Sequence, residues 1–166
     1  MKQSSDVDEW YTTNDMVDRI LPYIPDFSTV WCPFDKEDSN FVRRFTEAGI
    51  NVIFSHIDDG QDFFEYEPSE HYDYIISNPP FSRKDDVFER LFALNHPFAM
   101  VMSMNNIFDS KRRYAMFSSN DFEILVPHGR TKFIRGGATA ESMYAPPFQS
   151  VYVCHDMLPK QIVFTE

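Results

Sequence analysis

A strand, a helix and a second strand follow one another with short links between residues 29 and 56. The first strand, residues 29–32, is apolar and β-prone, and Pro33 ends it. The helix that follows has an apolar face and ends at Gly49, before a second strand at residues 52–56. Two strands joined through a helix run parallel, with a right-handed crossover. The chain is therefore expected to build an α/β sheet with its ligand site outside the carboxyl ends of the strands.

Further apolar segments extend this pattern over most of the 166 residues. Residues 98–102 are apolar throughout, which indicates a strand buried on both faces. We expect a single domain spanning residues 1–166, with a polar, frayed segment at residues 1–9. Other strands are expected at residues 74–76 and 122–126, with a last one at 151–154, and helices are expected from Thr13 or Asn14, from Asp85 or Asp86, and within 105–119.

The segment 73–81 joins a short apolar strand to a rigid loop. Pro79 and Pro80 fix φ and withhold two backbone donors, so their carbonyl groups remain free as acceptors. Asn78 precedes a proline and is pushed to an extended conformation, from which its side-chain carbonyl can face the same way. With Phe81 beside them, these acceptors suit a planar ligand that carries an NH2 group. The plainer alternative is an edge strand that runs into a proline-rich turn.

An Asn-Pro-Pro-Phe segment after a hydrophobic strand resembles the catalytic motif of methyltransferases that modify amino groups with S-adenosylmethionine, above all the phage-type DNA adenine-N6 enzymes. The resemblance extends from Trp10 to Val153 and includes a Pro-Phe-x-Ser segment that enters the last expected strand. It implies a Rossmann-like class I methyltransferase fold, with a mostly parallel sheet, helices on both faces and one antiparallel strand near the end. It also implies a catalytic role for the loop residues Asn78, Pro79, Pro80 and Phe81.

The same resemblance implies S-adenosylmethionine as the cofactor and no metal. A Trp-Tyr-Thr-Thr segment resembles the one that precedes the first strand of these enzymes, although core packing explains it equally well. A Pro-Phe-Asp turn stands where the family has a glycine-rich loop, but Lys36, Glu37 and Asp38 occupy the glycine positions. Since glycine lets the backbone approach a ligand closely, either this loop takes another shape or cofactor binding is weak or lost.

The expected contacts to the adenosine part of the cofactor follow the second strand. The family has an acid at the end of that strand, where this chain has His56, and either Asp58 or Asp59 can replace it. A Gly-Gln-Asp-Phe turn matches the family pattern, although Asp62 also suits an ordinary turn. The full set of expected cofactor residues is Tyr11, Thr12, Pro33, Phe34, Asp35, His56, Asp58, Asp62 and Phe63.

The charge balance does not favour a protein that grips duplex DNA. The chain has 26 acidic and 15 basic residues and a net charge of −11, whereas DNA-binding proteins usually present a basic face. An acidic chain also suits a basic protein partner. Any basic surface must therefore be local, and the alternative for its residues is a solvated helix face. The expected phosphate contacts are Lys111, Arg112, Arg113, Arg130 and Lys132.

No apolar run approaches the roughly 18 residues that a membrane-spanning helix requires, and the N-terminal residues have no signal-peptide core. Cys32 and Cys154 lie in strand-like sequence far apart, which favours buried free thiols and a reducing cytoplasm. The expected location is thus the cytoplasm, which is that of the bacterial host if the protein comes from a phage.

The function expected from these features is N6-methylation of adenine, with DNA as the favoured substrate. RNA adenine and a glutamine amide in protein offer the same planar NH2 group and remain open. A methyltransferase-like fold without activity, acting as an acidic binding or inhibitory protein, also remains open, as does a nucleotide-binding regulator.

Overall fold

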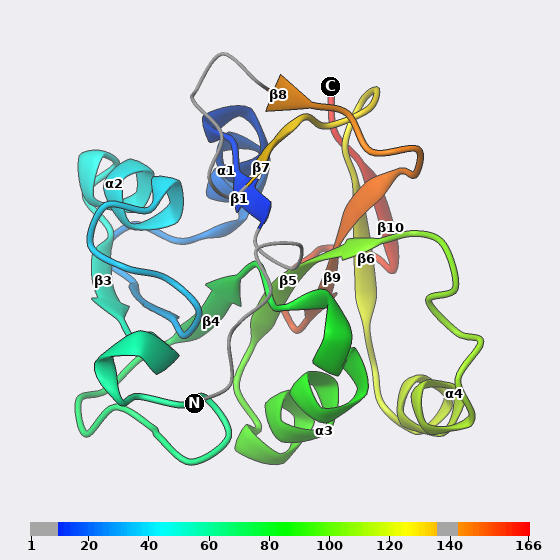
Figure 1. The fold of residues 1–166 in the computed structure, drawn as a ribbon, viewed down its shortest axis with the longest axis horizontal. Helices are drawn as coiled ribbons and strands as arrows, with labels where there is room; N and C mark the ends of the chain where they lie inside the picture. Colours follow the sequence, from blue (N-terminus) through cyan, green and yellow to red (C-terminus); the bar gives the residue numbers. More distant parts are fainter. Residues whose placement is uncertain (1–9, 136–142) are drawn as a thin grey trace.

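The protein is described here by a computed structural model that covers residues 10–135 and 143–166. The expected frayed segment at residues 1–9 and the glycine pair at 136–137 lie outside the described residues. A seven-stranded sheet runs through the middle of the molecule (Figure 1), in the order β10-β6-β9-β5-β4-β2-β3. Its strands are β2 (Thr29–Cys32), β3 (Asn51–Phe54), β4 (Tyr74–Ser77), β5 (Phe98–Ser103), β6 (Glu123–Val126), β9 (Ser150–His155) and β10 (Ile162–Phe164).

Every strand of this sheet runs parallel to the others except β9, which is inserted antiparallel between β5 and β6. The helix between β2 and β3 is the crossover that the sequence predicts for this pair. A mostly parallel sheet with helices beside it and one antiparallel strand late in the chain fits the Rossmann-like class I methyltransferase fold. The expected fold class is therefore confirmed.

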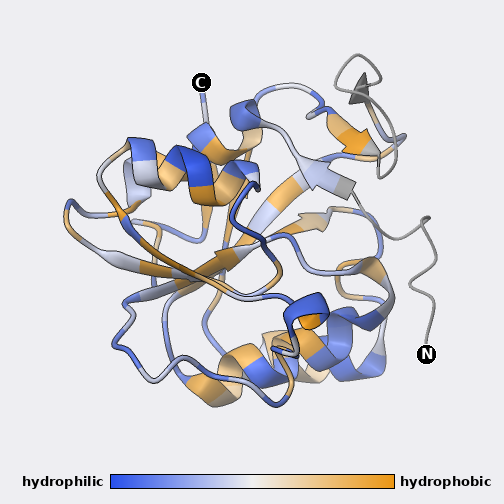
Figure 2. Cartoon of the chain, turned by 60° about the vertical axis from the view of Figure 1, so that its left-hand side comes forward, coloured by the Kyte–Doolittle hydropathy of each residue, from blue (hydrophilic) through white to orange (hydrophobic). Residues whose placement is uncertain are grey.

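Neighbouring residues of each buried strand point to opposite faces of the sheet, so the sheet has two apolar faces. Helices cover both of them. On one face Ile76 packs with α1 and α2, and on the other Ile75 packs with α3 and α4. Figure 2 shows the resulting hydrophobic strands in the interior and helices of mixed character outside them. The helices are α1 (Asn14–Ile20), α2 (Asn40–Glu47), α3 (Lys84–Leu94) and α4 (Lys111–Ser119).

Three short strands form a second sheet, in the order β1-β7-β8 and antiparallel throughout. Thr13 follows its first strand and donates a hydrogen bond to the carbonyl of Lys132, just before β7 (3.1 Å). The connection between β6 and β9 is thereby attached to the segment before α1. These strands are β1 (Trp10–Thr12), β7 (Phe133–Arg135) and β8 (Met143–Tyr144), and the 3-10 helices are η1 (Leu21–Tyr23), η2 (Ile57–Asp59) and η3 (Phe81–Arg83).

Two expectations about element boundaries are wrong. Neither Asp85 nor Asp86 caps α3, because η3 leads directly into the helix and Arg83 occupies the N-cap position. The strand at β9 is not the last one either, since the three residues of β10 follow it and pair with β6 at the edge of the sheet. In the part of the chain that the structure describes, no helix is both long and apolar enough to cross a membrane.

The hydroxyl of Tyr152 joins the sheet to α1 by donating to the carbonyl of Met16 (2.8 Å) in the buried interior. We expect Tyr152→Phe to lower the free energy of unfolding by about 1 kcal/mol, the usual net value of one internal hydrogen bond. Urea unfolding followed by circular dichroism measures the loss. Tyr114→Phe is the matched control, because Tyr114 is exposed, and an equal loss in both variants would contradict this account.

Candidate functional site

The Asn-Pro-Pro-Phe loop begins where β4 ends, at the carboxyl edge of the sheet between β2 and β5. Ser77 is the last residue of the strand and is fully buried. Asn78 is half-buried, Pro79 is buried, and Pro80 has φ −62° and ψ 137° before the chain turns into η3. The extended backbone at Pro80 is the conformation that proline residues in such loops favour. The loop thus lies where open α/β sheets bind their ligands.

A hollow of about 560 Å³ opens beside this loop and is called the Phe81 hollow below. It is lined by Phe81, Phe148, the end of β5 and the first residues of α3 and α4. The rings of Phe81 and Phe148 meet edge to face with their centroids 6.4 Å apart, and the ammonium group of Lys84 lies 5.0 Å from the Phe81 centroid. Two half-buried rings at one hollow offer a surface for a planar ligand.

Phe148 was not expected in the site, although the sequence contains a signal for it. Residues 146–148 repeat the Pro-Pro-Phe of residues 79–81. The second copy precedes β9, and because this strand is antiparallel to β5, its beginning lies at the same edge of the sheet as the end of β4. The topology therefore brings both copies to one place.

Asp35 connects the loop after β2 to the end of β4. Its buried carboxylate accepts a hydrogen bond from the Ser77 hydroxyl (2.5 Å), and its backbone N–H donates to the Ser55 carbonyl (3.2 Å). Burial raises the pKa of the Asp35 carboxyl to about 6, against the opposing effect of hydrogen bonds from Ser77 and Ser39. The side chain expected to contact a cofactor thus also holds the residue next to Asn78.

Tyr11 and Thr12 lie on β1, beside the start of α2. The side-chain amide of Asn40 donates to the Thr12 carbonyl (2.8 Å), which joins the two elements, and the Tyr11 side chain is exposed. Thr12 is 6% exposed, and its side-chain hydroxyl has no hydrogen-bond partner among the residues that the structure describes. Since a buried hydroxyl without a partner is costly, this atom fits a polar group of a bound ligand.

An ion pair closes the loop after β2, in which Lys36, Glu37 and Asp38 stand at the family's glycine positions. The ammonium group of Lys36 lies 2.7 Å from the carboxylate of Asp58, which keeps the pKa of that carboxyl below its usual value. His56 occupies the position where the family has an acid, and its Nδ1 accepts a hydrogen bond from the backbone N–H of Asp58 (3.0 Å). A ligand hydroxyl that binds Asp58 must therefore share this carboxylate with Lys36.

The remaining expected cofactor residues divide between a turn and the core. The Asp62 carboxylate accepts the backbone N–H of Phe64 (3.0 Å), as a turn aspartate does. Pro33 is buried and Phe34 is half-buried, whereas the Phe63 ring is buried against Trp31 and Phe34, with centroids 5.6 and 5.0 Å away. Their cofactor contacts stay predictions.

Sequence reasoning also missed Ile57, which directly follows His56. This residue is 63% exposed, although it stands between two groups expected to contact the adenosine. An exposed aliphatic side chain there offers an apolar surface to a purine ring. Its signal in the sequence is its position shortly after a strand, where it begins η2.

The five expected phosphate contacts do not form one group. Arg112 and Arg113 line the Phe81 hollow, and exposed Lys111 stands beside them at the start of α4. Arg130 and Lys132 are exposed on the connection between β6 and β7 and do not line this hollow. A nucleic-acid role for any of them stays a prediction.

Comparison with known proteins adds little detail. No protein-family model matches the chain, and no curated protein matches it. A solved structure from Thermoplasma acidophilum, described as that of a methyltransferase, is 11% identical with a TM-score of 0.42 over 93% of this chain and 69% of that one. The protein-(glutamine-N5) methyltransferase (release factor-specific) of Alicyclobacillus acidocaldarius is 14% identical with a TM-score of 0.42 over 93% and 99% of the two chains.

The raised pKa of Asp35 predicts a specific dependence of stability on pH. A carboxyl group whose pKa rises from 3.8 to about 6 on folding stabilises the protein below pH 3.8, and this contribution is lost as the pH rises through 6. We expect Asp35→Asn, which keeps an acceptor for Ser77, to become more stable relative to wild type between pH 4 and 7, by up to about 3 kcal/mol.

Urea unfolding at several pH values measures the difference in unfolding free energy between Asp35→Asn and wild type. Taking this difference cancels the contributions of the titrating groups that the two proteins share. Asp59→Asn is the control for the charge change, because Asp59 is exposed, and the change with pH found for Asp35→Asn should exceed whatever this variant shows. A flat profile for Asp35→Asn would show that Asp35 ionises as freely as an exposed carboxylate.

Proposed function

We propose that this protein is an S-adenosylmethionine-dependent methyltransferase that acts on a planar amino group, namely N6 of adenine in DNA. The observation that supports this most is the position of the Asn-Pro-Pro-Phe loop at the carboxyl end of β4, with the Phe81 hollow beside it. In a methyltransferase fold this edge of the sheet is where a ligand binds.

The residues around β1 and the ends of β2 and β3 fit the cofactor. Thr12 supplies a buried hydroxyl without a partner in the described structure, Ile57 an exposed apolar surface, and Asp58 an exposed carboxylate that suits ribose hydroxyls. Asp35 and Lys36 give the loop after β2 a shape of its own in place of the family glycines. When bound, the cofactor supplies an electrophilic methyl group on a sulfonium centre.

Asn78 and Pro79 carry the chemistry expected of the loop. The exocyclic amine of adenine is conjugated with its ring and is a poor nucleophile. The side-chain oxygen of Asn78 and the carbonyl of Pro79 accept its two N–H groups, which orients the lone pair and stabilises the positive charge that develops on nitrogen. Catalysis then comes from positioning and from dipoles fixed in advance.

The two aromatic rings favour a base over a glutamine side chain as the substrate. A purine extruded from its duplex can stack on the half-buried Phe81, with Phe148 beside it. A glutamine amide has the same NH2 group but no ring to stack. The rings thus add recognition that only a base uses.

Thr12→Val tests the cofactor site, since it replaces the hydroxyl with a methyl group of the same shape. We expect binding of S-adenosylmethionine to weaken by about 1 kcal/mol, or about fivefold in Kd by calorimetry, without loss of folding stability. Thr13→Val is the matched control, because its hydroxyl bonds to Lys132 and should affect stability and not Kd. Unchanged affinity in Thr12→Val would remove Thr12 from the cofactor site.

Substitutions in the loop test the reaction itself. Asn78→Ala removes an acceptor that acts as the amine becomes positive, so kcat should fall far more than substrate binding. Phe81→Ala removes a stacking surface worth about 1–3 kcal/mol per base and should weaken substrate binding. The measurement is transfer of labelled methyl groups to unmethylated DNA, with RNA and protein as parallel substrates and thermal melts of each variant.

Each outcome of the transfer assay has a separate meaning. Transfer to RNA or protein and not to DNA would correct the substrate and keep the chemistry. No transfer to any of the three by a folded wild type that binds the cofactor would overturn the proposed activity.

A further inference from the structure

The Phe81 hollow differs in charge from the rest of the molecule. Four basic side chains line it, against two acidic ones, in a chain whose net charge is −11. The acidic pair is Asp85 and Asp86, and the basic residues are Arg83, Lys84, Arg112 and Arg113. A local excess of positive charge beside an aromatic surface suits an anionic ligand that also has planar groups.

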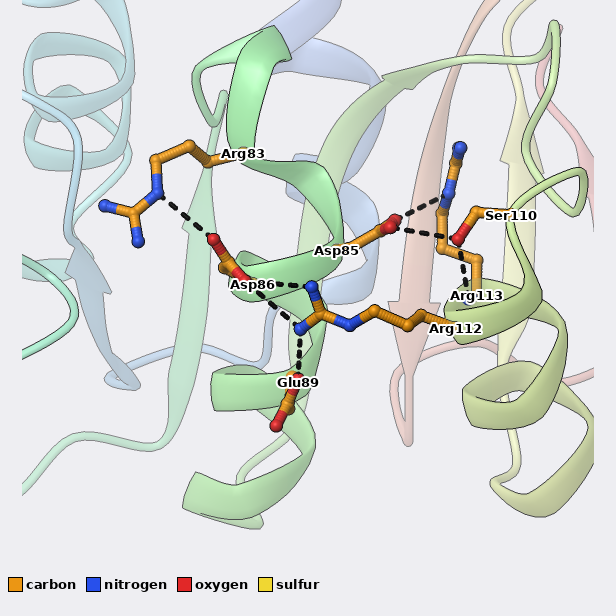
Figure 3. A network of polar contacts seen from close by, with 7 residues as sticks. All are labelled: Arg83, Asp85, Asp86, Glu89, Ser110, Arg112 and Arg113. Carbon is orange, nitrogen blue, oxygen red and sulfur yellow. Dashed lines mark hydrogen bonds and ion pairs between the residues drawn. The ribbon is translucent and has the colours of Figure 1, made fainter.

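Figure 3 shows how α3 and α4 share these charges. The Asp85 carboxylate forms an ion pair with the Arg113 guanidinium (2.8 Å) and accepts a hydrogen bond from the Ser110 hydroxyl (2.9 Å). The Arg113 side chain is only 15% exposed. Arg113 also donates to the Asn106 carbonyl (2.6 Å). Because this pair is largely buried and has additional hydrogen bonds, it holds the start of α4 in place and is not available to a ligand.

Arg112 is held in a different way. Both of its terminal nitrogen atoms lie 3.1 Å from one oxygen of Asp86, and Glu89 accepts a further hydrogen bond. The side chains of Arg112 and Asp86 are 51% and 40% exposed. Exposed pairs of this kind contribute little net stability, so an incoming anion can replace the carboxylates.

A phosphodiester suits this exchange for geometric reasons. The planar guanidinium group binds two oxygen atoms of a phosphate side by side, which a single shared carboxylate oxygen does not provide. Arg112 lines the same hollow as Phe81, so a phosphate on Arg112 lies next to a base stacked on the ring. The hollow thus offers neighbouring sites for a phosphate and a base, the two groups that recur along a nucleic-acid chain.

We infer that Arg112 binds a backbone phosphate of a nucleic-acid substrate, and that Asp86 and Glu89 occupy this arginine until the phosphate replaces them. The inference rests on the proposed function for the placement of the base, although binding of the phosphate does not need methyl transfer. The two carboxylates compete with every incoming phosphate, so a base stacked on Phe81 adds affinity that a phosphate alone lacks.

The test compares the affinity of variants for a short fluorescein-labelled DNA, by anisotropy at several salt concentrations and without cofactor. Asp86→Asn removes a competing carboxylate and should tighten binding about three- to tenfold at low salt. Arg112→Gln should weaken binding and lower the salt slope by about one. Asp86 also pairs with Arg83 (3.2 Å), which lines the same hollow. Asp86→Asn should therefore give a clearly smaller gain when Arg112→Gln is already present, since the larger part of its effect passes through Arg112.

Asp18→Asn is the matched control. Asp18 also pairs with an arginine, Arg44 at 2.7 Å, its side chain is 41% exposed, and its loss changes the net charge equally, but it lies on α1 across the sheet. An equal gain in Asp18→Asn would show a general charge effect and overturn the inference. So would a gain from Asp86→Asn that is undiminished without Arg112, or the absence of DNA binding in all variants that melt as wild type does.

The outcome is separable from that of the proposed activity. If the binding data agree and no methyl group is transferred, the phosphate site stands and the proposed function fails. If methyl transfer to protein occurs and DNA does not bind, the proposed chemistry stands and the phosphate site fails.

Discussion

Burial of β4 on both faces is the constraint on which the site depends. Ile75 packs into one core and Ile76 into the other, and neither is exposed to solvent. A slip of the strand by one residue would exchange these two side chains between the cores, so its register against β2 and β5 is strongly specified. Ser77 is therefore fixed beside Asp35, and Asn78 emerges at one defined point of the sheet edge.

Those elements that local patterns determine could be predicted from the sequence. Apolar periodicity predicted β2, α2 and β3 and hence a parallel sheet, and the proline pair after residues 74–77 predicted a rigid loop at a strand end. The sequence was not sufficient for β10, because three residues are too few for a periodic signal. The start of α3 was misplaced because a 3-10 turn precedes the helix and acts as its first turn.

Contacts between distant segments could not be predicted in the same way. The pairing of Phe81 with Phe148 requires β9 to enter the sheet antiparallel next to β5, and the repeated Pro-Pro-Phe at residues 146–148 does not by itself specify that strand direction. The ion pair of Lys36 with Asp58 and the pairing of Arg112 with α3 are also tertiary contacts. Charge composition alone also does not show that four basic side chains line one hollow of an acidic chain.

The exposed edge strand β10 gives the acidic character of the chain a second meaning. Its residues Ile162 and Phe164 have large exposed surfaces, and within residues 10–135 and 143–166 one side of the strand has no neighbour in the sheet. Such edges invite pairing with another molecule, and short length and charge are what limit it. A net charge of −11 makes copies of this chain repel one another, so the same acidity that opposes contact with DNA protects an apolar edge from self-association.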